Sequence, residues 1–234
     1  MRRVMLNLLK SPSSFSQAAS KSILNSLNTD CGTAPGEFVK WRYLGSSRNS
    51  RFASGFSPLQ PKPLETIMDV DRAKTASPED LAAIWDNYHL GRGHIGASVK
   101  SQLYHLIEQR ASECRYFVIP IWKGSGYTTM FCQTQMPHML FTGLEDYKAR
   151  GTQAAPYFTV TYYSEFSDTK GVVLIRGDIV FTSKLSDDEA KWLIETAQSF
   201  YLDDNRYKLV ECFNKKTREF QFKDVLRALD MPTL

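Results

Sequence analysis

The sequence predicts an α+β domain in which one mainly antiparallel sheet of about five to seven strands is flanked by helices. Segments with helical periodicity stand at both ends of the folding part of the chain. Between them, segments rich in aromatic and β-branched residues follow one another, and short glycine-containing turns join some neighbours. Helices before and after such a run of hairpin strands are typical of α+β proteins.

The first 52 residues have the composition of a mitochondrial transit peptide. Residues 1–29 contain no acidic side chain, whereas serine recurs among basic and apolar residues. This composition is typical of an organellar import signal, and the lack of a solid apolar stretch excludes a secretory signal. Arg51-Phe52 followed by Ala53 resembles a matrix-processing site. We therefore expect import into the mitochondrial matrix; plastid import and a merely basic tail are the alternatives.

The charge of the chain is concentrated in this leader. The whole chain has a net charge of +4, but residues 1–55 hold eight basic and two acidic side chains, so that the remaining residues carry −2. A slightly acidic domain lacks the basic surface that nucleic-acid binding requires, and we expect no nucleic-acid partner. No stretch approaches eighteen apolar residues, which predicts no membrane span.

Next come a lead-in and two helices. Prolines at 58, 61 and 63 predict an extended segment over residues 53–76. Ser77 and Pro78 form a helix start signal, and we expect this helix to carry its apolar face on Leu81, Ile84, Trp85 and Tyr88. A glycine-broken loop over 91–96 precedes a second helix over 100–112, with its inward side chains predicted at Leu103, Leu106 and Ile107.

The middle of the chain changes to strand periodicity. Strands are predicted at residues 116–122, 127–135, 139–142, 157–166 and 172–180. Residues 123–126 and 168–171 have the composition of tight hairpin turns, so their flanking strands should be antiparallel. A short helix over 144–150 interrupts the run.

The C-terminal part is predicted to return to helices. Ser186 and Glu189 form a capping box that opens a long helix to about Leu202. One more strand over 207–213 and a closing helix over 222–229 complete the prediction, which makes residues 77–234 a single domain.

No motif indicates an enzyme. Residues 91–96 fit the G-x-G-x-x-G pattern, but a helix precedes them where a dinucleotide site needs a strand, so we expect no cofactor. The four histidines form no metal-binding motif with each other or with the cysteines, and we expect no metal. The alternative is a small matrix enzyme with a site assembled from scattered residues such as Cys132, His138 and Glu165.

Large rings occupy both faces of the segment 157–166. A sheet that is covered by helices on both faces explains this pattern. A partner-binding face or edge explains it as well, because tyrosine and phenylalanine are enriched in interfaces.

Several stretches together resemble one protein family. They are residues 138–144, Arg150, Ala154-Ala155, 162–166 and 170–174, with further similarity in 117–126, 198–201, 209–214 and 219–220. In this order and spacing they are similar to the mitochondrial assembly factor that chaperones the beta subunit of the ATP synthase catalytic head. The resemblance runs from about Trp85 to the C-terminus, and it departs from the family pattern at Ser164, where a proline is expected.

The resemblance implies a chaperone without enzymatic activity or cofactor, monomeric when free. It would bind the unassembled beta subunit, prevent its aggregation and hand it over to the alpha subunit. Aromatic and arginine side chains dominate interface energies, so we place the contact within residues 138–166. The candidate contact residues are His138, Phe141, Arg150, Tyr162, Tyr163 and Glu165.

Overall fold

The computed structural model describes residues 61–90 and 92–232. The chain divides into two units, and the larger one spans Gly45–Phe220. Of the smaller unit the structure describes residues 221–232, which contain helix α9 (Phe222–Ala228) where the sequence predicts the closing helix. The predicted transit peptide lies outside the described residues. Among those described, no helix is both long and apolar enough to cross a membrane.

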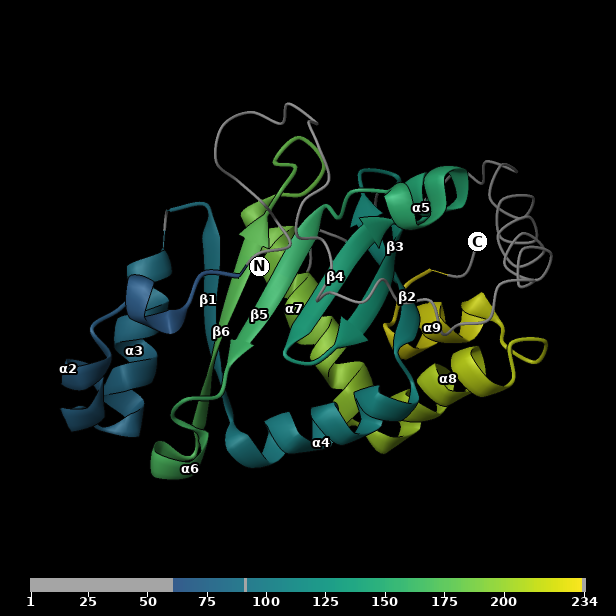
Figure 1. The fold of residues 1–234 in the computed structure, drawn as a ribbon. Helices are drawn as coiled ribbons and strands as arrows, with labels where there is room; N and C mark the ends of the chain where they lie inside the picture. The colour runs from purple at the N-terminus through teal and green to yellow at the C-terminus, as the bar shows by residue number, and fades with distance from the viewer. Residues whose placement is uncertain (1–60, 91, 233–234) are drawn as a thin grey trace, which may run out of the picture. The chain divides into compact units, whose positions relative to one another are not determined.

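The larger unit is built on a six-stranded sheet (Figure 1). Every pair of adjacent strands is antiparallel, which confirms the predicted α+β class. In spatial order the strands are β1 (His94–Lys100), β6 (Val172–Ile179), β5 (Phe158–Tyr163), β4 (His138–Gly143), β3 (Gly126–Gln135) and β2 (Tyr116–Lys123).

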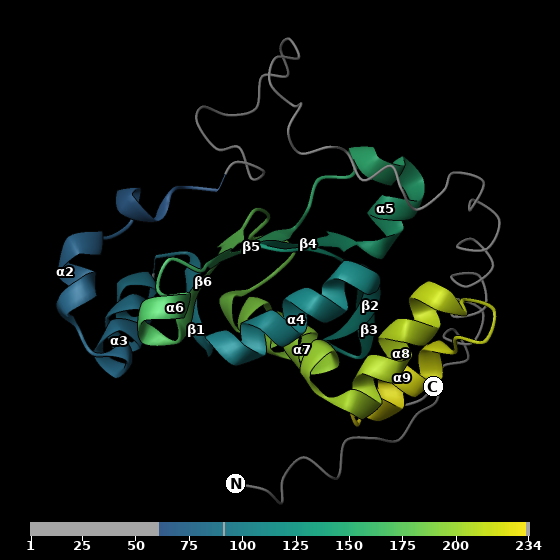
Figure 2. The same cartoon turned by 60° about the horizontal axis from the view of Figure 1, so that its bottom comes forward.

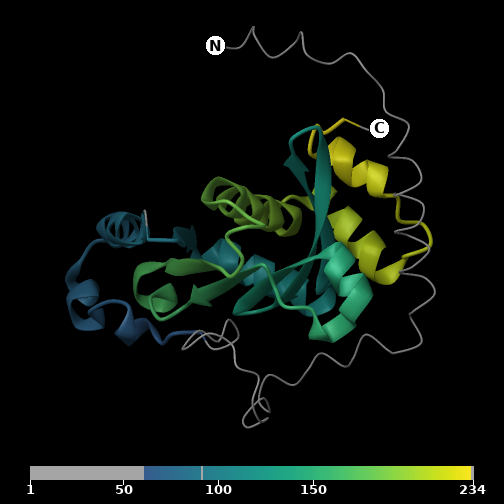
Figure 3. The same ribbon diagram turned by 90° about the horizontal axis from the view of Figure 1, so that it is seen from above.

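Helices pack on both faces of this sheet. The described helices of the larger unit are α2 (Val70–Thr75), α3 (Pro78–His89), α4 (Ser101–Glu113), α5 (Leu144–Arg150), α6 (Ser167–Lys170), α7 (Asp187–Leu202) and α8 (Asp204–Lys215), with short 3-10 turns η2 (Leu64–Thr66) and η3 (Gly151–Gln153). Figure 2 shows α4 and α7 on one side of the sheet, and Figure 3 shows α7 on the inner side of its curl.

Two glycines let the covering helices approach the strands closely. A Cβ on Gly177 of β6 would lie 3.2 Å from Cδ1 of Ile194 in α7, and one on Gly96 of β1 would lie 3.1 Å from the carbonyl oxygen of Trp85 in α3. Because Gly177 and Gly96 point to opposite faces in the strand register, α7 and α3 cover opposite faces. All six residues of β5 are accordingly buried.

Local capping signals predicted several helices correctly. The Ser77 side chain accepts a hydrogen bond from the Asp80 N–H at the start of α3. The capping box of Ser186 and Glu189 is formed at α7, which ends at Leu202 as predicted. The first predicted hairpin also forms, since Lys123 pairs with Gly126 across a two-residue turn. These features depend on contacts within a few residues, which is why the sequence contains enough information to predict them.

Two predicted segments have a different structure. Residues 207–213, predicted as a strand, lie within helix α8. Asp203 caps this helix by accepting from the backbone N–H groups of Asn205 and Arg206, and its buried residues are three apart, at Tyr207, Val210 and Phe213. The lead-in predicted to be extended contains η2 and α2 in its described part, because Asp69 caps α2 through the Arg72 N–H.

Strand β1 begins within the loop predicted over 91–96 and extends to Lys100, where the next helix was predicted to start. Apolar Ile95, Ala97 and Val99 alternate with polar or small residues along it, but the glycines at 91, 93 and 96 favoured a loop in the sequence. The connection between β5 and β6 also differs from the predicted tight hairpin. It consists of the short helix α6 and Gly171, which has a φ of 67° and ends that helix in the left-handed conformation.

The inward faces of the first two helices differ from the prediction in part. In α3 the buried stripe is Leu81, Trp85 and His89, whereas Ile84 and Tyr88 are exposed. In α4 the buried residues are Tyr104, Ile107 and Ala111, and Leu103 is exposed. Trp85 determines the rotation of α3, because its buried Nε1–H donates a 2.7 Å hydrogen bond to the Ile175 carbonyl of β6.

Candidate partner-binding site

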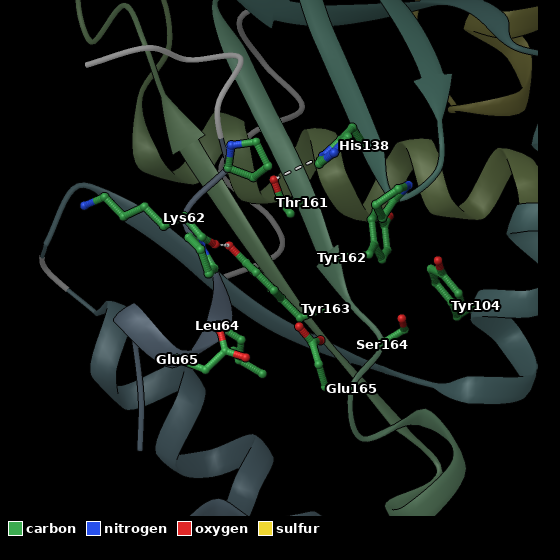
Figure 4. A pocket seen from close by; sticks show the side chains of 13 residues that line it. Lys62, Leu64, Glu65, Tyr104, His138, Thr161, Tyr162, Tyr163, Ser164 and Glu165 are labelled. Atoms are coloured by element: carbon green, nitrogen blue, oxygen red, sulfur yellow. Dashed lines mark hydrogen bonds between the residues drawn. The ribbon is translucent and has the colours of Figure 1, made fainter. Parts of the chain in front are cut away.

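A pocket of about 390 Å³ opens over the end of β5 (Figure 4). Three segments and one helix residue surround it, and together they bring distant parts of the sequence side by side. The lining consists of Pro61–Glu65 from the lead-in, Tyr104 of α4, Pro137 and His138 from the start of β4, and Thr161–Glu165. Four of the six predicted contact residues therefore line one pocket: His138, Tyr162, Tyr163 and Glu165.

His138 is positioned by strand pairing. It lies opposite Gln135 in β3 and opposite Thr161 in β5, after a two-residue turn that contains Pro137. The Thr161 hydroxyl lies 3.4 Å from its Nδ1. Burial lowers the pKa of His138, so the imidazole is neutral at pH 7 and contributes shape and hydrogen bonding to the pocket instead of charge.

The two adjacent tyrosines point to opposite faces of the sheet. Tyr163 donates a 2.8 Å hydrogen bond from its hydroxyl to the Lys62 carbonyl, and its ring centre lies 5.8 Å from that of Trp85. Burial raises the pKa of Tyr163 to about 12. This tyrosine ties the lead-in to the sheet, and it remains neutral at physiological pH.

Tyr162 reaches the pocket from the α4 side. Its hydroxyl accepts a 3.2 Å hydrogen bond from Nε2 of Gln198 in α7, and its ring centre lies 5.7 Å from that of Tyr104. Burial raises the pKa of Tyr162 as well. With exposed fractions of 2% for Tyr162 and 6% for Tyr163, both rings are mainly core residues that form the wall of the pocket.

The rim of the pocket is exposed and carries both signs of charge. Lys62 and Glu65 come from the lead-in, and Glu165 follows the end of β5. Ser164, where the family resemblance leads us to expect proline, is exposed beside Glu165. A rim of mixed charge suits a polar protein surface better than a ligand of a single charge sign.

The remaining two predicted residues lie elsewhere. Phe141 is fully buried on the face that α7 covers, where its ring centre lies 5.6 Å from that of Phe158. Arg150 is exposed at the end of α5 and does not line the pocket. The lead-in residues of the pocket and Tyr104 were not predicted, because no local pattern shows which strand end a distant segment will cover.

The residues of the alternative enzyme hypothesis do not converge. In the register of β3 and β4, Cys132 points to the face opposite to His138, and Glu165 lies beyond the end of β5. Burial raises the pKa of Cys132 to about 12, so its thiol is a poor nucleophile. Within the described residues, no group of three or more His, Cys, Asp or Glu could hold a metal ion. The turn after α3 leads into a strand, which is the reverse of the strand–turn–helix order of a dinucleotide site.

Comparison with known proteins agrees with the resemblance seen in the sequence. A family model described as "ATP11 protein" matches residues 18–226. The chain is 29% identical over 175 residues to a human protein named "ATP synthase mitochondrial F1 complex assembly factor 1", and 28% identical over 184 residues to the mouse protein of the same name. It is 27% identical over 181 residues to "Protein atp11, mitochondrial" of Schizosaccharomyces pombe.

These alignments cover 74%, 78% and 72% of the chain respectively. They cover 53%, 56% and 63% of the relatives, so the chain spans little more than half the length of the curated proteins that it matches. The family model, in contrast, extends over most of the chain, and the protein therefore belongs to the ATP11 protein family.

Proposed function

We propose that the protein is an assembly factor of the mitochondrial F1 ATP synthase that binds the unassembled beta subunit. It prevents aggregation of this subunit and releases it when the alpha subunit arrives. The observation that carries the proposal is the family match over residues 18–226, together with human and mouse relatives that are named as F1 complex assembly factors.

The physical task of such a factor is to cover a surface temporarily. A subunit of a ring exposes its future interfaces until the ring closes, and exposed apolar interfaces lead to aggregation. A binder that recognises the free subunit shifts the equilibrium away from aggregation by mass action, and competition by the correct neighbour displaces it. This exchange requires surface complementarity and moderate affinity, without a chemical step.

The six predicted residues divide into two groups under this proposal. Glu165 and Arg150 are exposed and His138 is half-buried, and these three make direct contact with the partner. Phe141, Tyr162 and Tyr163 are buried and hold the strands that present the contact surface.

The proposed location is the mitochondrial matrix. The acid-poor composition of the first 29 residues supports it, and so do the names of the relatives, which include the word mitochondrial. Import of the full chain into isolated mitochondria, followed by protease treatment, tests this part. A full chain that stays accessible to protease at the outer surface would contradict it.

Capture of isolated subunits tests the main proposal. The purified protein is titrated against purified alpha and beta subunits separately, and complex formation is followed by sedimentation. We expect a complex with beta, dissociation of that complex on addition of alpha, and reduced light scattering of beta during dilution from denaturant. Capture of neither subunit would refute the proposed function, and capture of alpha alone would assign the protein to the other subunit.

A further inference from the structure

The outer edge of β1 carries backbone groups that have no partner among residues 61–90 and 92–232. The Ser101 N–H donates a 2.9 Å hydrogen bond to the Gly171 carbonyl, in register with the pairing of β1 and β6. Hydrogen-bonded pairs alternate along an antiparallel ladder, so Ile95, Ala97 and Val99 point their N–H and C=O groups toward β6. Those of Gly96, Ser98 and Lys100 point away from the sheet.

No described residue bonds to the outward groups of Gly96 and Ser98 or to the Lys100 N–H, whereas the Lys100 carbonyl, at the N-cap of α4, faces the first turn of that helix. The side chains of Ser98 and Lys100 are exposed as well. The strand contains no proline, and its one formally charged residue lies at its end. An edge with unpaired N–H and C=O groups is a template for the addition of another strand.

The opposite edge of the sheet, β2, is closed to such an addition. The Asn214 side chain of α8 accepts from the Tyr116 N–H at 3.1 Å and donates to the Tyr116 carbonyl at 2.7 Å. These bonds show that Tyr116 points its backbone outward, and by the period of two so does Pro120. Pro120 has no N–H to offer, and proline at such a position is a common protection of sheet edges.

We propose that β1 binds an extended segment of the unassembled F1 subunit as a seventh strand of the sheet. This inference rests on the proposed function. Alternate residues of the added strand would lie beside Ile95 and Val99 on the α7 face and beside Ser98 and Lys100 on the other face. The segment should therefore alternate in polarity, with an apolar set on one side and an acidic residue opposite Lys100.

The charged end of the edge favours one placement of the segment. Lys100 ends β1 and is exposed, so an acidic residue of the partner beside it would match its charge. A second copy that paired symmetrically about Ala97 would instead place Lys100 opposite His94, beside the Arg176 guanidinium that lies 3.0 Å from His94, at both ends of the pair. Because Asp178 is already paired with Arg176, self-pairing offers Lys100 no unpaired carboxylate, whereas an acidic residue of the partner would provide one.

The substitution Ser98→Pro tests the inference because it copies the protection seen at Pro120. It removes an outward N–H and leaves the hydrogen bonds to β6 in place, whereas the matched control Ser98→Ala keeps the N–H. In a titration of the full chain with purified beta subunit, we expect Ser98→Pro to raise the Kd at least 10-fold and Ser98→Ala to change it less than 2-fold. Both variants should keep a wild-type Tm.

Hydrogen exchange gives a second readout that needs no variant in the strand. In the complex, the amides of Gly96, Ser98 and Lys100 should exchange at least 10-fold more slowly than in the free protein. The outward amides of β2 at Val118 and Trp122 should not change. If Ser98→Pro disturbs folding, Lys100→Glu replaces it, since this exposed charge reversal leaves the backbone intact and should also weaken binding.

Four results would overturn the inference. Wild-type affinity of Ser98→Pro with unprotected β1 amides would place the subunit elsewhere and leave the proposed function intact. Amides already protected in the free full chain would show that a segment of this chain occupies the edge. A homodimer that Ser98→Pro abolishes would make a second copy the occupant. Failure of the wild-type protein to bind either subunit would remove the proposed function and the inference together.

Discussion

The two edge strands of the sheet differ in how their outward backbone N–H and C=O groups are protected. Both β1 and β2 end the sheet, and each has a row of backbone groups that no further strand in the described part of the chain pairs. At β2, Pro120 and the Asn214 side chain remove or satisfy outward groups. At β1, helix α3 packs on the face at Gly96 and leaves the edge itself unpaired among the described residues. The difference teaches that protection of a sheet edge is selective, and that the unprotected edge is the one to examine for binding.

Among the substitutions that test this comparison, removal of the Trp85 side chain should cause the largest loss of stability. Trp85 joins α3 to β6 through its hydrogen bond to Ile175 and is 1% exposed. We expect Trp85→Ala to lower the free energy of unfolding by about 3–5 kcal/mol, measured by urea denaturation. The control Ile84→Ala lies on the same helix but is exposed, and should cost less than about 1 kcal/mol. Equal losses of stability in the two variants would show that the packing of α3 on the sheet does not depend on its buried residues.

Asn214→Ala should weaken the protected edge. It removes the two hydrogen bonds to Tyr116 and a third, of 2.7 Å, to the Val210 carbonyl. We expect a loss of about 1–3 kcal/mol in the free energy of unfolding, together with faster hydrogen exchange of the Tyr116 amide. Asn205→Ala, on the exposed start of the same helix, is the control and should change stability by less than about 0.5 kcal/mol. An unchanged exchange rate at Tyr116 would argue against protection of this edge by the Asn214 hydrogen bonds.

Gly96→Ala should separate α3 from the open edge. The added Cβ would lie 3.0 Å from the His89 Cβ, which is closer than ordinary van der Waals contact. We expect a loss of about 1–3 kcal/mol, because the helix or the strand must shift. Gly126→Ala in β3 meets nothing within 4 Å and should be nearly neutral. A neutral Gly96→Ala would mean that α3 can move away from β1 at little cost.

The open edge should also be the more sensitive one to acid. Burial lowers the pKa values of His89 and His94 below the value of about 6.5 expected in the unfolded chain. The unfolded state therefore binds protons first as the pH falls, and the stability present above pH 6.5 is lost between that pH and the folded pKa values.

We expect the free energy of unfolding to decrease from pH 7.5 to 5.5, and His94→Gln to make this decrease smaller. The Arg176 guanidinium beside His94 contributes to its lowered pKa, while Asp178 opposes it. His105→Gln, on an exposed position of α4, is the control. A pH dependence that is the same in wild type and His94→Gln would exclude His94 as its source.

Pro120→Val should have the smallest effect on stability and a visible effect on association. It restores an outward N–H to β2 without touching the ladder to β3. We expect the free energy of unfolding to change by less than about 1 kcal/mol, and self-association to increase at high concentration, measured by light scattering. Pro61→Val, in the lead-in outside the sheet, should leave the association state unchanged. If the Pro120→Val variant stays monomeric, Asn214 is sufficient to protect this edge without Pro120.

Parts of the fold that depend on local contacts could be predicted, and parts that depend on long-range contacts could not. The capped starts of α3 and α7 and the helix over Leu144–Arg150 were predicted from residues within one or two turns. Strand β1 was missed because its hydrogen bonds come from β6, far along the chain. Helix α8 was mistaken for a strand because its buried residues resemble a strand in composition, while the cap at Asp203 decides its structure.

The candidate site shows the same division. Residues 138–166 were predicted as the contact region, and four of the six predicted residues line one pocket. Which rings are accessible could not be predicted, because tyrosines 162 and 163 face opposite sides of a sheet that helices cover on both faces. The lead-in side of the pocket is formed by a segment about a hundred residues away in sequence, held by the hydrogen bond between Tyr163 and Lys62.

The sequence by itself determined the fold class, the basic and acid-poor composition of the leader, the helix caps, one hairpin and the family resemblance. These follow from composition, from order along the chain and from interactions between near neighbours. Only the tertiary structure decided the order of the strands, the burial of Phe141, Tyr162 and Tyr163, and the contrast between a closed β2 edge and an open β1 edge. Each of these depends on which distant segments meet, and no local energy term carries that information.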